Sequence, residues 1–147
     1  MQDKKQLLQD SLGYALVRVF RQVNRTANRT LRRFGLSAEQ AHILLLLWLS
    51  GPLKVGELQR LLALSSATLT GALDRMERAG SVRRVADEGD GRSWRVEPTE
   101  QIGARARREI EEALTAIEEG CFAALTATER RELLKMFEKI SASLAHF

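Results

Sequence analysis

The chain has 147 residues, of which 44% are hydrophobic and 29% charged, the composition of one ordinary globular domain. This length can bury a core without disulfides, and a single cysteine excludes an internal disulfide framework. The longest apolar run, residues 43–49, is too short to cross a bilayer, and the polar N-terminus lacks the pattern of a secretory signal. We therefore expect a cytoplasmic protein.

The positive charge is concentrated near the N-terminus. The net charge is +4, but residues 1–36 alone carry eight basic side chains against two acidic ones. Charge gathered in one part of a cytoplasmic protein favours a polyanionic partner.

Apolar residues at helical spacing predict one long helix from Asp3 to Phe34, ended by Gly35. Arginines recur on the opposite side of this helix at steps of three and four residues: Arg18, Arg21, Arg25, Arg29 and Arg32.

A capping box formed by Ser37 and Gln40 predicts the start of a second helix, which runs to Ser50. This helix is apolar nearly all round and therefore belongs in the core. Gly51 and Pro52 stop it.

Two shorter helices follow, Val55 to Leu62 and Ser65 to Ala79, with a link too short to separate them. Ser65 or Ser66 caps the second of them, and Gly80 ends it. This pattern is typical of a helix-turn-helix.

After Gly80 the period changes to that of strands, with Val82–Val85 and Trp94–Val96 joined by the polar loop 87–92. The residues Arg83, Arg84 and Arg95 are expected as charges on the strand surface. Thr99 is expected to cap a helix running to about Gly120, and a capping box of Thr126 and Glu129 opens the last helix.

These elements fit the two grooves of B-DNA. A helix with short polar side chains at its N-terminus suits the major groove, where base edges are exposed. An arginine near the tip of a hairpin suits the narrow minor groove, so Arg92 is the candidate. We expect the Asp90 carboxylate to hold the Arg92 guanidinium.

The order of elements from Leu36 to Thr99 resembles the MarR family of bacterial transcription regulators. The segment Ser65 to Gly80 resembles the family's recognition helix, including Asp74 and Arg75, and Asp90-Gly91-Arg92 resembles its wing signature. The flanking helices resemble its dimerisation frame.

The resemblance implies a homodimer that binds a pseudo-palindromic operator in double-stranded DNA, in most relatives as a repressor. It also implies release by a small aromatic or anionic effector.

The predicted fold is mainly α-helical with a small two- or three-stranded antiparallel wing. The predicted parts are an N-terminal dimerisation helix (1–36), a winged helix-turn-helix lobe (37–98) and C-terminal dimerisation helices (99–147).

Three groups of residues are candidates for function. The DNA-binding candidates are Ser65, Ser66, Thr68, Thr70, Arg75, Arg84, Asp90 and Arg92. The candidates for phosphate contacts are Arg29, Arg32 and Arg33, and those for an effector cleft are Tyr14, Arg18 and Trp48.

The chain departs from the family pattern in three places. Gly71 stands where many relatives carry a base-reading arginine, so direct readout by the helix is expected to be weak. Lys54 gives the following helix no good N-cap, and the segment after Pro98 differs from the usual pattern by one residue.

Other functions are less well supported by the sequence. Cys121 follows two glutamates and is expected to fill space rather than to sense redox state, and His42 has no second ligand nearby for zinc. No phosphate loop, nucleophile elbow or paired metal motif indicates an enzyme, a cofactor or a metal site. Two alternatives stay open, a constitutive or architectural DNA-binding protein without an effector and a helical protein-interaction module.

Overall fold

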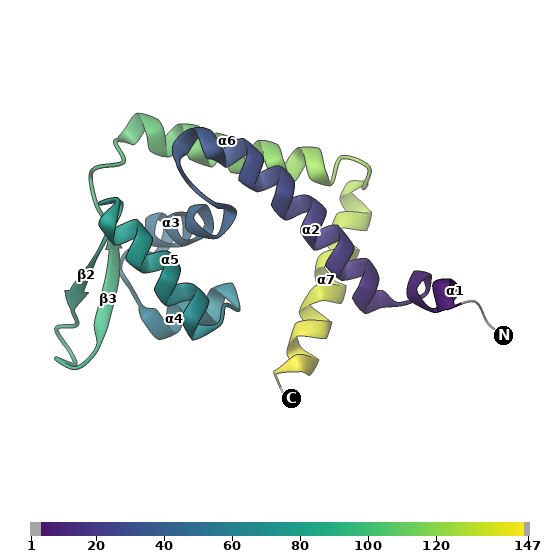
Figure 1. The fold of residues 1–147 in the computed structure, drawn as a ribbon, viewed down its shortest axis with the longest axis horizontal. Helices are drawn as coiled ribbons and strands as arrows, with labels where there is room; N and C mark the ends of the chain where they lie inside the picture. Colours follow the sequence, from purple (N-terminus) through teal and green to yellow (C-terminus); the bar gives the residue numbers. More distant parts are fainter. Residues whose placement is uncertain (1–3, 146–147) are drawn as a thin grey trace. The chain divides into compact units, whose positions relative to one another are not determined.

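The structure is a computed structural model that describes residues 4–145, so Asp3 and His146 lie outside the described residues. It is mainly helical with one small sheet (Figure 1). Residues 1–114 and 115–147 form two compact units, and the boundary falls within helix α6. The predicted division into three parts stays a prediction.

The first predicted helix is interrupted, which corrects the expectation of one continuous helix from Asp3 to Phe34. It consists of α1 (Lys4–Gln9), α2 (Leu12–Leu31) and a short 3-10 turn, η1 (Arg32–Phe34). The break arises because the Ser11 side chain accepts a hydrogen bond from the Tyr14 backbone N–H, as an N-cap does. Gly35 ends the segment in the left-handed region, with φ 70°.

Helix α3 (Ala38–Ser50) is central to the core of the first unit. The predicted capping box is present, with the Ser37 side chain accepting from Gln40 and the Gln40 side chain accepting from Ser37. The Asn28 side chain of α2 also accepts from the Ala38 backbone N–H at 2.8 Å, which fastens α2 to the start of α3.

The core joins α3 to the helix-turn-helix and the sheet. Its buried members come from α3, α4 (Val55–Leu62), α5 (Ser66–Arg78), β2 and β3. They are Ile43, Leu44, Leu47, Leu58, Leu69, Ala72, Leu73, Met76, Val82 and Val96. Burial of each large member contributes about 1.5–3 kcal/mol. This one cluster therefore stabilises the lobe that carries α5 and the wing, the two elements proposed from the sequence to contact DNA.

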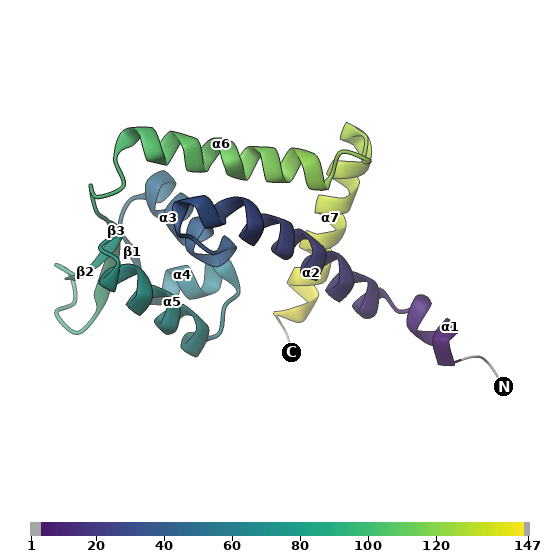
Figure 2. The same cartoon turned by 45° about the horizontal axis from the view of Figure 1, so that its top comes forward.

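The sheet has three antiparallel strands in the order β1-β3-β2, which confirms a small wing. They are β1 (Leu53–Lys54), β2 (Val82–Ala86) and β3 (Trp94–Pro98). Figure 2 shows β1 beside β3, where Leu53 pairs with Val96. The two residues of β1 thus tie the wing to the start of α4.

Thr99 does not cap the next helix, contrary to expectation. Its hydroxyl donates to the Gly80 carbonyl, and its backbone N–H donates to Ser81 at 3.0 Å. Helix α6 (Ala104–Cys121) begins five residues later. Thr99 therefore closes the wing rather than opening a helix.

The second unit contains the end of α6 and α7 (Ala127–Leu144), which opens on the predicted capping box of Thr126 and Glu129. Helix α7 exposes large apolar side chains: Leu134, Met136, Phe137, Ile140 and Leu144. Among the described residues, no helix is long and apolar enough to cross a membrane.

Candidate nucleic-acid interface

The start of α5 is open to solvent and well capped. The Ser65 side chain accepts from the Thr68 backbone N–H at 3.2 Å and donates to the Thr68 hydroxyl at 2.8 Å. Ser66 and Thr70 are also exposed. Of the four predicted hydroxyls, two therefore stabilise the helix start and two present their side chains to solvent.

Helix α4 begins without a side-chain cap at Lys54, as expected from the sequence. The Glu57 carboxylate instead accepts from the Lys54 backbone N–H at 2.8 Å. The helix ends at Ala63, which adopts the left-handed conformation with φ 50°. This conformation costs a non-glycine residue about 1–2 kcal/mol and makes the tight turn into α5.

The end of α5 is joined to the wing through Arg84. The Arg84 guanidinium contacts Asp74 at 2.8 Å and also pairs with Glu77, and both acids lie on α5. These contacts, the Asp74 hydrogen bond first, raise the pKa of Arg84. Arg84 therefore ties β2 to α5, whereas Arg75 stays exposed on the same helix.

The tip of the wing differs from expectation in one detail. The Asp90 carboxylate accepts from the Arg92 backbone N–H at 3.1 Å, and no described hydrogen bond joins it to the guanidinium. The Asp90 carbonyl also accepts from the Ser93 backbone N–H at 2.9 Å. Asp90 thus shapes the turn, which leaves the Arg92 side chain exposed at the tip.

The sequence did not single out the ion-pair cluster at the base of the wing. Asp87 is buried, with 6% of its surface exposed, and contacts Lys54 at 2.9 Å and Arg95 at 2.8 Å. The Ser93 hydroxyl donates to the same carboxylate at 3.2 Å, and Arg95 donates to the Pro52 carbonyl. We call Lys54, Asp87 and Arg95 the wing clamp.

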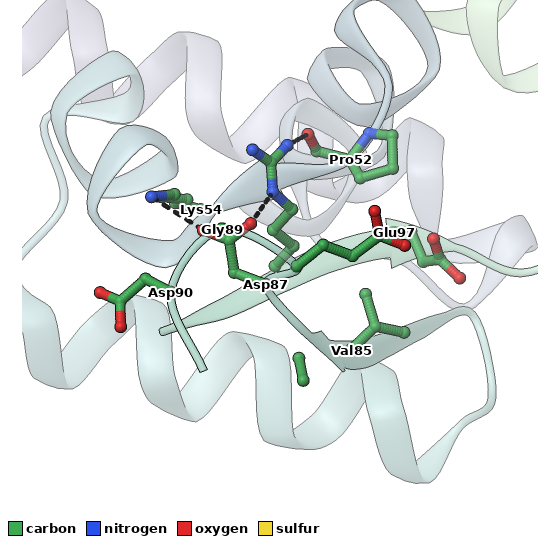
Figure 3. A pocket seen from close by; sticks show the side chains of 10 residues that line it. Pro52, Lys54, Val85, Asp87, Gly89, Asp90 and Glu97 are labelled. Carbon is green, nitrogen blue, oxygen red and sulfur yellow. Dashed lines mark hydrogen bonds and ion pairs between the residues drawn. The ribbon is translucent and has the colours of Figure 1, made fainter. Parts of the chain in front are cut away.

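The wing clamp joins three separate segments of the chain. Figure 3 shows Lys54 and Asp87 pointing toward each other, with Asp90 turned away from them. They line a shallow hollow of about 630 Å³. The bonds from Lys54 and then Arg95 hold the pKa of Asp87 well below its usual range, and the pKa values of Lys54 and Arg95 are raised.

Alternation along the strands could have indicated part of this cluster. Val85 pairs with Arg95, so Arg95 shares the sheet face that points away from Arg84. The sequence could not indicate that Lys54, more than thirty residues earlier, would join that face, because β1 has only two residues.

The arginine side of α2 is exposed at Arg18, Arg21, Arg25 and Arg29, and α2 contains no acidic residue. Arg32 and Arg33 follow in η1, also exposed, and the Arg33 guanidinium lies 4.7 Å from the centre of the Phe34 ring. The candidate phosphate contacts therefore lie at the end of α2, beside the start of α3.

The effector-cleft candidates fall into two groups. The Arg18 guanidinium lies 5.7 Å from the Tyr14 ring centre, within α2. Trp48 of α3 is half-buried, with the Arg107 guanidinium of α6 5.2 Å from its ring centre. The Tyr14 ring is thus paired with Arg18 and the Trp48 ring with Arg107, and the two pairs share no residue.

Neither Cys121 nor His42 lies in a cluster of potential metal ligands among the described residues. Cys121 is a half-buried free thiol. Within residues 4–145, no group of three or more histidine, cysteine, aspartate or glutamate side chains is placed to hold a metal ion.

The similarity to known proteins agrees with this geometry. The MarR family model matches residues 36–94, which include α3, the helix-turn-helix and the wing as far as the first residue of β3. The HTH-type transcriptional repressor Mb2911 of Mycobacterium bovis is 31% identical over 131 residues, 89% of this chain and 94% of that protein. The chain belongs to the MarR family.

Two further proteins are similar to the chain. The HTH-type transcriptional regulator PecS of Dickeya dadantii is 33% identical over 100 residues, which cover 66% of this chain but only 60% of PecS. An E. coli MarR mutant complexed with operator DNA has a TM-score of 0.77 and 25% identity, covering 88% of this chain and 92% of that one.

Family membership confirms the predicted fold and the general function, a DNA-binding transcription regulator of the winged-helix type. The individual DNA-contacting residues stay predictions, as do the effector and the homodimer.

Proposed function

We propose that the protein is a homodimeric repressor that binds a pseudo-palindromic operator and is released by a small aromatic or anionic effector. The observation that carries the DNA-binding part is the pairing of the α5 N-terminus and the Arg92 tip on one packed lobe. Arg84 ties the wing to α5, and the wing clamp ties it to α4. This double attachment favours simultaneous entry of helix and wing into neighbouring grooves.

In this proposal Ser66, Thr70 and Arg75 meet the major groove, because their side chains are exposed on α5. Ser65 and Thr68 offer the capped helix N-terminus to a phosphate. Arg92 enters the minor groove, and Arg29, Arg32 and Arg33 contact flanking phosphates. Arg84 and Asp90 act by placing α5 and Arg92, although the sequence proposed both as contacts.

The homodimer is supported by apolar faces that each protomer leaves uncovered. In α2 and just before it, Leu8, Leu12, Leu16, Val19 and Phe20 are all at least 49% exposed. Helix α7 exposes a second apolar set of its own. Ile110 of α6, by contrast, is already buried within the protomer. Exposed apolar faces this large favour a protein partner, and a second copy supplies a complementary one.

The effector site is proposed near Tyr14 and Arg18, where an exposed guanidinium beside an aromatic ring suits an anionic aromatic molecule. Trp48 is a weaker candidate because Arg107 already covers its ring. We further propose that the protein is a cytoplasmic regulator that acts without enzymatic activity, a cofactor or a metal ion.

The test is binding to a duplex covering the region upstream of the protein's own gene, compared with a random duplex of equal length over a range of salt concentrations. We expect a clear preference for the upstream duplex, and Arg92→Ala should weaken that binding by about 1–3 kcal/mol. Equal affinity for both duplexes would favour the alternative of a constitutive or architectural DNA-binding protein. Gly71, which stands where many relatives carry a base-reading arginine, and the exposed arginines of α2 agree with that alternative. No binding at low salt would leave a helical interaction module.

The dimer is tested separately with Leu16→Glu, which places a charge on the exposed apolar face of α2. Light scattering should show that this variant is monomeric at micromolar concentration while the unsubstituted protein is dimeric. Gln22→Glu adds the same charge near the arginine side of the helix and should leave the dimer intact. A monomeric unsubstituted protein would contradict the proposed assembly.

A further inference from the structure

The wing carries an exposed tryptophan that the functions above do not use. Trp94 is the first residue of β3 and is 55% exposed, whereas Trp48 is half-buried. A single exposed apolar side chain is ordinary on a protein surface, so exposure alone indicates nothing. The position of Trp94 on the sheet is more informative.

The strand register places Trp94 on the side of the sheet that faces α5. Trp94 pairs with Ala86, and the next pair on the same face is Val96 with Arg84. Val96 is buried in the core, and Arg84 reaches Asp74 on α5. Trp94 therefore continues the α5-facing row beyond the core toward the wing tip, while Arg95 turns to the wing clamp on the other face.

The small cross-strand neighbour leaves the Trp94 ring uncovered. Ala86 is itself exposed and has no side chain beyond Cβ with which to pack over the indole. The ring thus borders the space between α5 and the Arg92 tip, on the α5 side of the wing.

If α5 occupies the major groove and Arg92 the minor groove, the DNA strand that separates the two grooves passes through this space. That strand presents the faces of deoxyribose rings and phosphate oxygens. An indole supplies an apolar body for the sugar and one N–H donor for a phosphate oxygen.

We propose that Trp94 is a DNA-contacting residue whose indole packs against the sugar-phosphate backbone between the helix and the wing. The proposal rests on the proposed DNA-binding function and adds a contact that the wing signature does not contain. The contact is largely apolar, so it adds affinity without releasing counterions from the DNA.

The first test measures binding of Trp94→Ala to the upstream duplex at several salt concentrations. We expect about tenfold weaker binding, the equivalent of about 1.4 kcal/mol, with an unchanged slope of affinity against salt. Arg92→Ala should instead reduce the slope, because it removes a cation. Leu49→Ala, which shortens another exposed apolar side chain at the end of α3, should bind as the unsubstituted protein does.

The second test observes the indole directly. In a Trp48→Phe background Trp94 is the only tryptophan, and its fluorescence should become protected from acrylamide when the upstream duplex is added. Labelling the unsubstituted protein with 5-fluorotryptophan gives the same information without the background substitution, because only the Trp94 fluorine resonance should shift.

The outcomes separate the two proposals. If the unsubstituted protein binds the duplex and Arg92→Ala weakens binding, but Trp94→Ala does not and the indole stays accessible, the Trp94 contact is wrong and the DNA-binding function stands. Protection of Trp94 by an added effector or by dimerisation without DNA would assign the ring to that partner and overturn the proposal. Failure of the unsubstituted protein to bind DNA overturns both.

Discussion

Replacing Gly80 with alanine tests how the recognition helix is joined to the wing. Gly80 has φ 79°, and the backbone N–H groups of Gly80 and Ser81 donate to Glu77 and Met76, which closes the end of α5. An alanine in this left-handed region costs about 1–2 kcal/mol, partly offset by about 0.4–1 kcal/mol from a less flexible unfolded chain. We expect a net loss of about 1 kcal/mol.

Thermal unfolding at fixed protein concentration measures this loss, which should lower the Tm by about 2–4 °C. The added Cβ would also meet the end of the exposed Gln101 side chain. Repeating the substitution in a Gln101→Ala background removes that contact, and the loss should persist because the backbone causes it. A loss that vanishes in this background would refute the backbone explanation.

Two matched substitutions test the sign of the effect. Gly71→Ala makes the same change in the interior of α5, where the new Cβ meets the Arg75 guanidinium at an ordinary 3.5 Å, and should raise stability by about 0.5–1 kcal/mol. Ala63→Gly relieves the left-handed turn before α5 and should also raise the Tm slightly. An unchanged Tm for Gly80→Ala beside a normal gain for Gly71→Ala would refute the reasoning.

Two further predictions concern the attachments of the wing. Arg84→Met should lower the free energy of unfolding by about 0.5–2 kcal/mol, because it removes two ion pairs whose acidic partners are 48% and 41% exposed, and the loss should shrink in 1 M salt. The control Arg83→Met removes an ion pair on the sheet face that points away from α5 and should cost less. Equal losses in the two variants would contradict the role assigned to Arg84. The lowered pKa of Asp87 means that its charged form stabilises the fold above the pKa of an unfolded carboxyl, about 3.9, and that this stabilisation is lost as the pH falls toward the folded value. Asp87→Asn should therefore lower the Tm at pH 7 and converge with the unsubstituted protein in acid, and a difference that is constant from pH 7 to pH 3 would exclude the ion pairs as its cause.

The sequence predicted those elements whose signals are local. The capping boxes at Ser37 and Thr126 place two helix starts correctly, since both partners of each box lie within four residues. Local signals also misled: Thr99 has the residue type of a cap, but its hydroxyl is used by the Gly80 carbonyl. The break at Ser11 was missed because the apolar spacing continues across it.

The geometry of the site depended on longer-range pairing. Asp90 and Arg92 were correctly assigned to the wing loop. The Asp90 carboxylate, however, accepts a hydrogen bond from the Arg92 backbone N–H and not from its guanidinium, because aspartate readily forms an Asx-turn with the N–H two residues later. The wing clamp was not predicted because Lys54 reaches Asp87 through a two-residue strand that no periodicity reveals. The position of Trp94 likewise required the register of β2 and β3.

The wing is attached on both sides by charged groups, and each attachment contains partly exposed ones. The acids that hold Arg84 are 48% and 41% exposed, and the cations that hold Asp87 are 42% and 41% exposed. Added salt screens such pairs, so both attachments of the wing should loosen as ionic strength rises. The decline of DNA affinity with salt would then contain a contribution from the protein itself, in addition to the counterions that the DNA releases. A count of phosphate contacts taken from that slope alone would be too high, whereas the difference in slope between two variants with the same wing attachments cancels this contribution.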